Sequence, residues 1–588
     1  MMQASRFVCT LCIVLVASCG SSQDASQQGE PQTQASADWV LSGGKIYTVD
    51  EQGSWAEAVV IADRKIVYVG DNAGARRFIT DDTRKVDLAG RLVIPGLIDG
   101  HTHPAYIGLE NYGAVLSGTS KDEILSAIRD YATSHPDDEW IRLYGWPNSL
   151  YVSGTEGPHK RDLDAIVPDR PVWITSVPWH SYWLNSAALE KLGVDKDTPD
   201  PLPGVAMYAR DEAGELTGWV KEGAAWQHLA SQFDVDTAAH ERSVTEFLNG
   251  LSESGVTTVY DGGNFGYEDL VYDFLSRLEK AGALPLRYEG TYQIFTPERR
   301  ALAIPEMKRL QEAYGGERLR FRTIKLFMDG VNENRSAAML KPYLDHPGYV
   351  GNTMLNSEEL RQFLLELNEE KFDLHIHTIG DRAVRTVLDG VEAAKASVRG
   401  DFFPRVTIAH LEVIDPLDMQ RIKDLGITAN FTPWWFGASE SDSVASAALG
   451  EERSSRTYAA RSLSDLGARV TFSSDDWTLN VLSPFLGMQV GQTRQFPKEW
   501  SAEDGEGDPA SRPPASERMD FEDMLRGYTT DGAYPFRLED QIGSIEPGKL
   551  ADLVVFEADL FAMDRAELHK VKPVAVMMEG ELIHGELR

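Results

Sequence analysis

Short apolar runs alternate with amphipathic stretches through the middle of the chain. The runs with the β-branched content of buried strands are RLVIPGLID, PVWITSV, GVTTVYD, LRYEGTY, RFRTIKLFMD, FDLHIHT, RVTIAHL, ITANF and RVTFSSD. Segments of helical periodicity, such as SEELRQFLLELNEEK and DPLDMQRIKDLG, lie between several of them. This alternation predicts an α/β fold in which residues 91–539 form a (β/α)₈ TIM barrel with insertions. A doubly wound open sheet is the alternative, but no GxGxxG turn opens the unit.

Both ends of the chain carry a second pattern, in which β-branched runs with partial alternation are separated by Gly, Asp and Asn. It covers residues 37–90, for example WAEAVVIADRKIVYVG, and residues 540–588, for example VAVMMEGELIHGELR. Such runs are typical of antiparallel strands. We therefore predict one small β-sandwich domain built from both termini, with two unrelated β-segments as the alternative.

The beginning of the chain differs from the rest. Arg6 precedes an apolar run at 7–17, which is too short for a membrane span of roughly 20 residues but suits the core of a signal peptide. The stretch LVASC at its end resembles a bacterial lipoprotein signal. It predicts a signal peptide at 1–18, lipidation of Cys19 and a flexible tether at 19–36, with a plain secretory signal as the alternative. The expected location is the bacterial cell envelope, on the periplasmic side of the outer membrane and held through the lipid anchor only, or secretion.

Charge and cysteine content narrow the function classes. The chain has 588 residues and a formal net charge of −34, a sign that repels nucleic acid, so we expect no nucleic-acid partner. The only cysteines, Cys9, Cys12 and Cys19, all lie in the leader. The body of the protein therefore has no disulfide, no thiolate metal ligand and no cysteine nucleophile. A metal site there must use histidine, carboxylate or a modified lysine.

Two apolar strands end in histidines. The stretch PGLIDGHTH has His101 and His103 at its end, and RVTIAH closes with His410. Because successive side chains of a strand face opposite ways, residues two apart, such as these two histidines, have their imidazoles on the same side. Barrel enzymes have their active sites at the carboxyl ends of the strands, which is where these residues are expected.

Eight motifs in order carry a family resemblance. They are PGLIDGHTH, WLNSAAL, GVTTVYDGG, TIKLFMDG, HIHTIGDRA, IAHLEVID, TFSSDDW and GSIEPGKLADLVVF. The chain from about Ala37 to Arg588 resembles the amidohydrolase superfamily, and within it the family 3 branch that includes N-substituted formamide deformylases. The resemblance implies that one or two divalent metal ions are held by His101, His103, Lys325, His377, His410 and Asp475. Neutral imidazole suits Zn²⁺, with Fe²⁺ and Mn²⁺ as alternatives.

Three of these assignments have alternatives. Lys325 matches a lysine that CO₂ carboxylates to bridge two metals; the alternative is an unmodified partner for Asp329. His375 shares the inward face of its strand with His377, and the spacing to Gly380-Asp381 favours His377. In TFSSDDW, adjacent strand residues face opposite ways, so that only one of Asp475 and Asp476 can face the metals. The motif register selects Asp475.

The resemblance also implies residues around the substrate. His180 in VPWHSYWLNS is expected near the substrate, stabilising a developing oxyanion, and Glu222 in TGWVKEGA is expected in the pocket wall. A capping histidine and a solvated glutamate are the alternatives. Tryptophans near predicted strand ends indicate either an aromatic pocket or core packing: Trp146, Trp173, Trp179, Trp183, Trp434, Trp435 and Trp477.

The implied function is that of a metal-dependent amidohydrolase. A metal-activated water would hydrolyse a non-peptide C–N bond of an amide, N-formyl or carbamate type, with Asp475 taking its proton and returning it to the leaving group. An esterase, lactonase or isomerase on the same centre, or a catalytically inactive surface lipoprotein, are the alternatives. The substrate is expected to be a small molecule whose identity the sequence leaves open. Homodimers are common in the superfamily.

Overall fold

The computed structural model describes residues 37–587, apart from 107–108, 110–111, 119, 148–149, 151–156, 439–440, 477–482 and 501–509. The predicted signal peptide, the lipidation site Cys19 and the tether lie outside the described residues. Within the described part, no helix has both the length and the apolar character needed to cross a bilayer.

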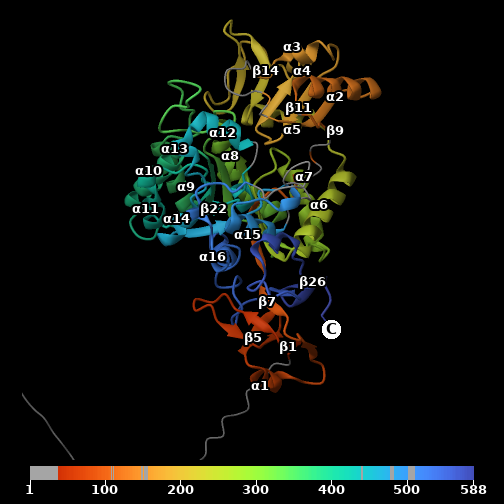
Figure 1. Cartoon of the computed structure of the whole chain (residues 1–588), viewed down its shortest axis with the longest axis vertical. Coiled ribbons are helices and arrows are strands. Elements are labelled where there is room, and N and C mark those ends of the chain that lie inside the picture. Colours follow the sequence, from red (N-terminus) through yellow and green to blue (C-terminus); the bar gives the residue numbers. More distant parts are fainter. Residues whose placement is uncertain are drawn as a thin grey trace, which may run out of the picture.

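Two parallel sheets form the centre of the molecule (Figure 1). One has the order β18 (Leu319–Phe321), β16 (Arg287–Gly290), β15 (Val256–Asp261) and β8 (Leu97–Thr102). The other has the order β17 (Gln293–Ile294), β19 (Thr323–Phe327), β20 (Asp373–Thr378), β21 (Val406–His410), β22 (Thr428–Phe431) and β23 (Arg469–Phe472). The expected mixed α/β class is confirmed. The described strands do not, however, pair into one closed barrel.

The two parallel sheets continue into each other. Only residues 291–292 separate β16 from β17, and only residue 322 separates β18 from β19. β16 pairs with β18, and β17 pairs with β19. At the other side, beyond the end of β23, Asp475 N donates to His101 O at 2.7 Å and His103 N donates to Asp476 O at 2.9 Å.

Amphipathic helices connect the parallel strands. α9 (Ser357–Glu370) begins with a capping box between Asn356 and Glu359, and it buries an apolar stripe at helical spacing, namely Leu360, Phe363, Leu364 and Leu367. α9 and α11 (Pro416–Asp424) lie where the sequence predicts helices. The other long connecting helices are α6 (Thr237–Glu253), α7 (Glu268–Lys280), α8 (Pro297–Tyr314) and α10 (Asp381–Ser397).

Strands from the two ends of the chain pair with each other. One sheet has the order β26 (Glu581–Gly585), β25 (Ala575–Met578), β24 (Leu553–Phe556), β7 (Leu92–Pro95), β2 (Lys45–Tyr47) and β3 (Trp55–Ala56). A second has the order β5 (Lys65–Gly70), β4 (Ala58–Ala62), β1 (Trp39–Ser42) and β6 (Arg84–Asp87). Buried side chains of both sheets share one core, among them Leu41, Ile61, Val93 and Val555.

A separate six-stranded sheet is formed by an insertion after β8. Its order is β13 (Met207–Arg210), β14 (Leu216–Lys221), β12 (Ser181–Leu184), β11 (Val172–Ser176), β10 (Ile141–Trp146) and β9 (Ala114–Val115). Figure 1 shows it at the opposite end of the molecule from β1 and β5. The run PVWITSV, expected among the central parallel strands, is β11 of this sheet. Its apolar face packs on α2 (Lys121–Ser134). The amino-acid pattern of a buried strand is the same in either sheet, so the pattern does not tell which sheet the strand joins.

Candidate metal centre

The six predicted ligand residues all line one cavity of about 410 Å³. Except for Lys325, which lies in the middle of β19, they lie at or just beyond the carboxyl ends of parallel strands, which meet at one edge of a sheet. His101 and His103 come from the end of β8, and Asp475 follows β23. The remaining residues belong to β19, β20 and β21: Lys325, His377 and His410.

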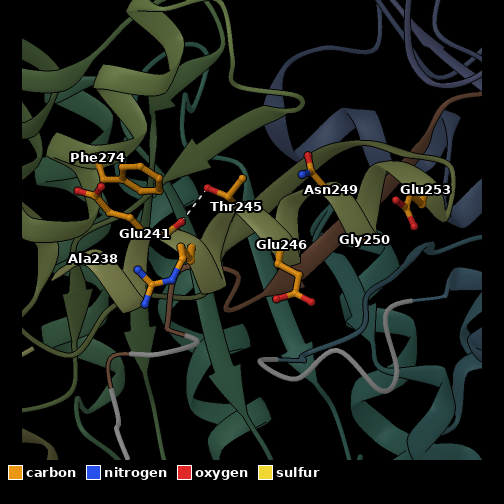
Figure 2. Close-up of a pocket in the computed structure, with 9 residues that line it drawn as sticks. Ala238, Glu241, Thr245, Glu246, Asn249, Gly250, Glu253 and Phe274 are labelled. Atoms are coloured by element: carbon orange, nitrogen blue, oxygen red, sulfur yellow. Dashed lines mark hydrogen bonds between the residues drawn. The ribbon is translucent and has the colours of Figure 1, made fainter. Parts of the chain in front are cut away.

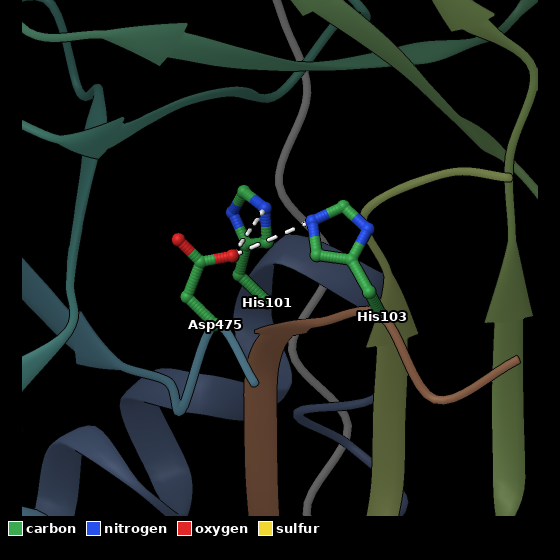
Figure 3. A group of neighbouring side chains, drawn as sticks. All are labelled: His101, His103 and Asp475. Atoms are coloured by element: carbon green, nitrogen blue, oxygen red, sulfur yellow. Dashed lines mark ion pairs between the residues drawn. The ribbon is translucent and has the colours of Figure 1, made fainter. Parts of the chain in front are cut away.

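His101, His103 and Asp475 form the centre of this cluster. Figure 3 shows both imidazoles turned toward the carboxylate. Nε2 of His101 lies 3.5 Å from Asp475 Oδ1, and Nε2 of His103 lies 3.4 Å from the same oxygen. One ligand atom from each of the three residues lies within 4.8 Å of the others. This spacing allows a single cation to contact all three residues.

His410 and His377 extend the cluster. His410 Nδ1 lies 3.6 Å from Asp475 Oδ2, and its ring centroid lies 4.6 Å from that of His377. His410 is buried, and in the part of the chain that the structure describes its Nδ1 has no hydrogen-bond partner. A buried imidazole nitrogen without a partner is costly unless something binds there.

The backbone is strained where two of these residues sit. His410 has a φ of 75° and Asp475 has a φ of 47°, in a region that non-glycine residues rarely adopt. Such strain persists only when the surrounding structure imposes it, and it is concentrated at functional sites. Because Asp475 has left the extended conformation, strand alternation does not separate it from Asp476, and both line the cavity. Asp475 is the one beside His101 and His103.

Hydrogen bonds at the other ring nitrogen fix the orientation of His101 and His103. His375 Nε2 lies 2.9 Å from His101 Nδ1, and His103 Nδ1 donates to the carbonyl oxygen of Gly263 at 3.1 Å. Each contact leaves Nε2 of the ring facing Asp475, and partners of this kind fix ring orientation and tautomer at metal sites. His375 therefore supports His101, whereas His377 lines the cavity.

Burial keeps the clustered histidines uncharged. It is the main cause that lowers the pKa of His101, His377 and His410 well below the usual value, with positive neighbours such as Lys325 adding to the effect. Neutral imidazoles have a free lone pair and can bind a metal ion near pH 7.

Lys325 is fully buried beneath the cluster. Its Nζ lies 3.0 Å from His101 Nε2. Burial lowers the pKa of Lys325 to about 7, against opposing charges of Asp475 and Asp261. Asp329, the alternative partner, instead accepts hydrogen bonds from the backbone N–H groups of Ile379, Gly380 and Ala338.

His180 and Glu222 form a pair beside the cavity. His180 lines the cavity, and its Nδ1 donates to the Glu222 carboxylate. Burial is the largest single effect and lowers the pKa of His180, but the charge and hydrogen bond of Glu222, together with the charges of Glu333 and Asp475, make the net change upward. Glu222 is buried behind the histidine and is not among the described residues that line the cavity. Its expected place in the pocket wall therefore stays a prediction.

Two functional contacts were not expected from the sequence. Asp99 accepts from the backbone N–H groups of His101 (3.3 Å) and Ser474 (3.0 Å), which ties β8 to the segment after β23. Burial raises the pKa of Asp99 to about 7. A β-carbon added at Gly262 would lie 2.6 Å from His103 Cε1 and 2.8 Å from His101 Nε2. Asp99 stands inside the motif PGLIDGHTH and Gly262 inside GVTTVYDGG. Their places in these motifs were the feature of the sequence that could have indicated a role at the site.

Aromatic side chains form most of the remaining cavity wall. Trp179, Trp226 and Phe265 lie on one side, and Trp434 and Trp435 follow β22. Several are fixed by hydrogen bonds: Trp226 Nε1 donates to Tyr182 OH at 2.7 Å, and Trp434 Nε1 donates to Ser474 O at 2.6 Å.

The predicted tryptophans divide between the cavity and the core. Trp179, Trp434 and Trp435 line the cavity. Trp146, Trp173 and Trp183, by contrast, are fully buried packing residues. Trp477 lies outside the described residues.

A second hollow, of about 800 Å³, runs along α6 (Figure 2). It is lined by polar and acidic side chains of one helix together with Phe274, including Glu246 and Glu253. Glu241 at its edge is paired with Arg277. No histidine lines it among the described residues, so the chemistry lies in the smaller cavity.

Comparisons with known proteins agree with this geometry. The model of the amidohydrolase family matches residues 84–584. The protein LONG AFTER FAR-RED 3 of Arabidopsis thaliana is 30% identical over 89% of this chain and 88% of its own. The N-substituted formamide deformylase of Arthrobacter pascens is 26% identical over 93% and 98%. An uncharacterised metal-dependent hydrolase from Pyrococcus horikoshii shares the fold, with a TM-score of 0.66, 24% identity and coverage of 90% and 99%.

Proposed function

The chain belongs to the amidohydrolase family, and on that premise we propose that it is a metal-dependent hydrolase of a non-peptide C–N bond in an amide, N-formyl compound or carbamate. One observation carries the proposal. Ring nitrogens of His101, His103 and His410 lie within 3.6 Å of one carboxylate, that of Asp475. Together with His377 and Lys325 they line a cavity large enough for a small molecule.

The donor set fits a divalent cation. Uncharged imidazoles and a carboxylate are the ligands that Zn²⁺ and related ions take in proteins. Nδ1 of His410, which has no hydrogen-bond partner among the described residues, is the group that such an ion would satisfy. When bound, a divalent metal lowers the pKa of water and polarises a carbonyl group.

The residues of the chain supply the remaining chemistry. Asp475 is placed to accept a proton from the attacking water and to return it to the leaving nitrogen. His180, held by Glu222, offers a hydrogen bond to the oxygen that becomes negative during attack. The aromatic walls exclude bulk water, which strengthens both interactions.

We propose further that Lys325 is carboxylated. A neutral amine is needed to attack CO₂, and a pKa of about 7 provides it. The Nζ–C bond forms, one proton is released, and the product is an anionic carbamate. A carbamate carries two oxygens that are able to hold two cations, which matches the position of Nζ below His101.

We propose that the two parallel sheets act as one (β/α)₈ barrel with interrupted strands. The pairings of β16 with β18 and of β17 with β19, and the two backbone bonds that join the segment after β23 to β8, support this. The shared core of the two terminal sheets likewise supports a β-sandwich of both termini.

We propose that lipidation of Cys19 anchors the protein on the cell envelope. The residues LVASC support this, because the lipoprotein signal ends on the residue that becomes modified. Fractionation of cells that express the wild type and Cys19→Ala would test it. Release of the variant from the membrane fraction is expected, and equal retention of both proteins would contradict it.

The function is tested with metal-loaded protein and a panel of N-acyl, N-formyl and carbamate compounds. We expect stoichiometric metal by elemental analysis and turnover that requires it. Asp475→Asn should reduce kcat by at least about 10³-fold, since the proton acceptor is lost, while the protein remains folded. An active Asp475→Asn variant would overturn the role of Asp475, and a metal-loaded wild type that cleaves no member of the panel would overturn the C–N assignment.

A further inference from the structure

Glu222 is a fully surrounded carboxylate outside the cavity. One of its oxygens accepts from His180 Nδ1. The other, Oε1, accepts from Ser336 Oγ at 2.6 Å and from Asn334 Nδ2 at 3.3 Å. The residue is only 2% exposed. A buried charge is costly unless it is well bonded, so this carboxylate is held in one position.

The backbone at this pair is strained on both strands. Glu222 has a φ of 54° at the end of β14, and Trp179, just before His180, has a φ of 62°. Glu222 N donates to His180 O at 3.1 Å, and Asn334 Nδ2 donates to the same oxygen at 2.7 Å. Positive φ is unfavourable at a glutamate and at a tryptophan. The surrounding bonds impose this geometry, which turns the two side chains toward each other.

Asn334 joins the pair to its surroundings. Ser181 Oγ donates to Asn334 Oδ1 at 2.6 Å, and Lys221 Nζ donates to the Asn334 carbonyl oxygen at 3.1 Å. The side chains of Glu222 and Asn334 are therefore fixed by several independent contacts. A carboxylate fixed in this way determines which way the neighbouring imidazole faces.

The orientation of the His180 ring follows from these contacts. Nδ1 is occupied by Glu222, so Nε2 is the ring nitrogen left for a ligand in the cavity. The ring lies 5.4 Å from that of Trp226 and 5.7 Å from that of His377, measured between centroids. His180 thus faces the end of the cavity that holds the metal-type residues.

We propose that Glu222 is a positioning residue that holds His180 with Nε2 toward the scissile group of the substrate. The inference rests on the proposed function and adds a residue to it that has no contact with the cavity. Glu222 acts only through His180. Its removal should therefore lower turnover without weakening substrate binding, and it should have no effect where His180 is already absent.

A double-mutant cycle tests this with Glu222→Gln, His180→Asn and the double variant. Glutamine keeps the size of the side chain and a hydrogen-bonding oxygen but removes the charge. We expect Glu222→Gln to lower kcat by about 10- to 100-fold with KM changed by less than about threefold, in the range found for residues that orient a catalytic group. The double variant should be no slower than His180→Asn alone.

Ser336→Ala is the matched control, because it removes one bond to Glu222 and leaves the His180 contact in place. We expect kcat within about fivefold of the wild type. Metal content and thermal midpoint are measured for all variants. Multiplicative losses in the double variant, or an unchanged kcat in Glu222→Gln, would overturn the proposal.

A second readout separates this inference from the proposed function. In metal-free protein with ¹⁵N-labelled histidine, His180→Asn identifies the His180 signals. We expect a protonated, strongly downfield Nδ1–H in the wild type that moves upfield in Glu222→Gln, because a neutral amide oxygen accepts a weaker hydrogen bond than a carboxylate. A wild type without turnover on any substrate would overturn the proposed function alone. An unchanged Nδ1–H shift in Glu222→Gln would overturn the positioning role alone.

Discussion

The stability of the folded protein depends on the protonation state of a few buried side chains at its centre. His101, His375, His377 and His410 are packed together with Lys325, and burial lowers the pKa of each imidazole. The imidazoles of this cluster are therefore uncharged near neutral pH. The cluster becomes a source of instability when the pH falls.

The stability of the metal-free protein should therefore fall in acid, and His375 allows a clean test. Its folded pKa lies below the unfolded value near 6.5, so below that pH the unfolded state binds the proton and the folded state resists it. This term is absent above pH 6.5 and destabilises the protein as the pH falls below it. Removing the histidine should flatten the decline by up to about 1.4 kcal/mol per pH unit.

Denaturant unfolding of metal-free wild type and His375→Gln at pH 7.5, 6.5 and 5.5 measures this difference. The comparison cancels opposing groups such as Asp99 and Asp329, whose pKa values burial raises to about 7 and which gain protons on folding. Parallel declines in the two proteins would contradict the prediction.

The sequence was sufficient to predict which residues form the cluster, but not which role each of them has. Alternation turned both His375 and His377 inward, and only the packed structure distinguishes the one that supports His101 from the one that lines the cavity. Glu222 was expected to contact the substrate because its motif position was known and its partner was not. Which group a side chain bonds depends on contacts across 42 residues of sequence, which periodicity does not report.

At the scale of elements, the close approach of β15 to β8 shapes the site. Gly262 follows β15 and lies against both histidines of β8. Its φ is in the ordinary range, so alanine there is excluded by space and not by backbone conformation. The turn therefore requires a glycine because of the imidazoles it faces.

Gly262→Ala should displace His103 and His101 and weaken metal binding by at least about tenfold, comparable to the loss of an orienting contact. Metal titration with a competing chelator measures the affinity. Gly282→Ala is the control: its φ of 68° costs stability, but no atom lies within 4 Å of the added carbon, so affinity should be unchanged. Equal affinity in both variants would show that the close approach does not matter.

The pattern of apolar and polar residues was sufficient to predict many of the strands and helices, but not which strands pair in the same sheet. The runs that became β19 to β23 and the helices α9 and α11 were expected where they occur. The run PVWITSV was expected beside them, yet it belongs to the inserted sheet. A strand buried on both faces has the same composition in any sheet, so its partners come from long-range topology.

Across the whole molecule, a buried charge network joins the parallel strands to the terminal sheet. Arg287 of β16 pairs with Asp552 and Glu579, all of them buried. Breaking such a pair from one side leaves a buried charge uncompensated.

Arg287→Met should lower the free energy of unfolding by about 3–5 kcal/mol, because buried Asp552 loses its arginine partner, whereas Glu579 keeps Arg64 and Arg318. Arg277→Ala is the control. It removes an exposed pair with Glu241, which should cost less than about 1 kcal/mol. Denaturant unfolding at pH 7.5 compares them, and similar losses in both variants would mean that the network does not hold the two parts together.

The charge of the molecule also limits the substrate. Among the described residues that line the cavity, Lys325 is the only lysine or arginine, whereas Glu333, Glu412 and Asp476 are acidic and the other walls are aromatic. The net charge of −34 adds to this field. Away from the residues that would hold a metal ion, we therefore expect this wall to favour a neutral or cationic aromatic amide over an anionic one.

Three N-acyl compounds isolate this effect: the derivatives of phenethylamine, phenylalaninol and phenylalanine share the aromatic group and differ at one carbon. The carboxylate of the third meets like charge, which costs several kcal/mol. We therefore expect its kcat/KM to be at least about 100-fold below that of the phenylalaninol derivative, which has similar size and no charge. Similar rates for these two, both slower than the phenethylamine compound, would show that space and not charge selects the substrate.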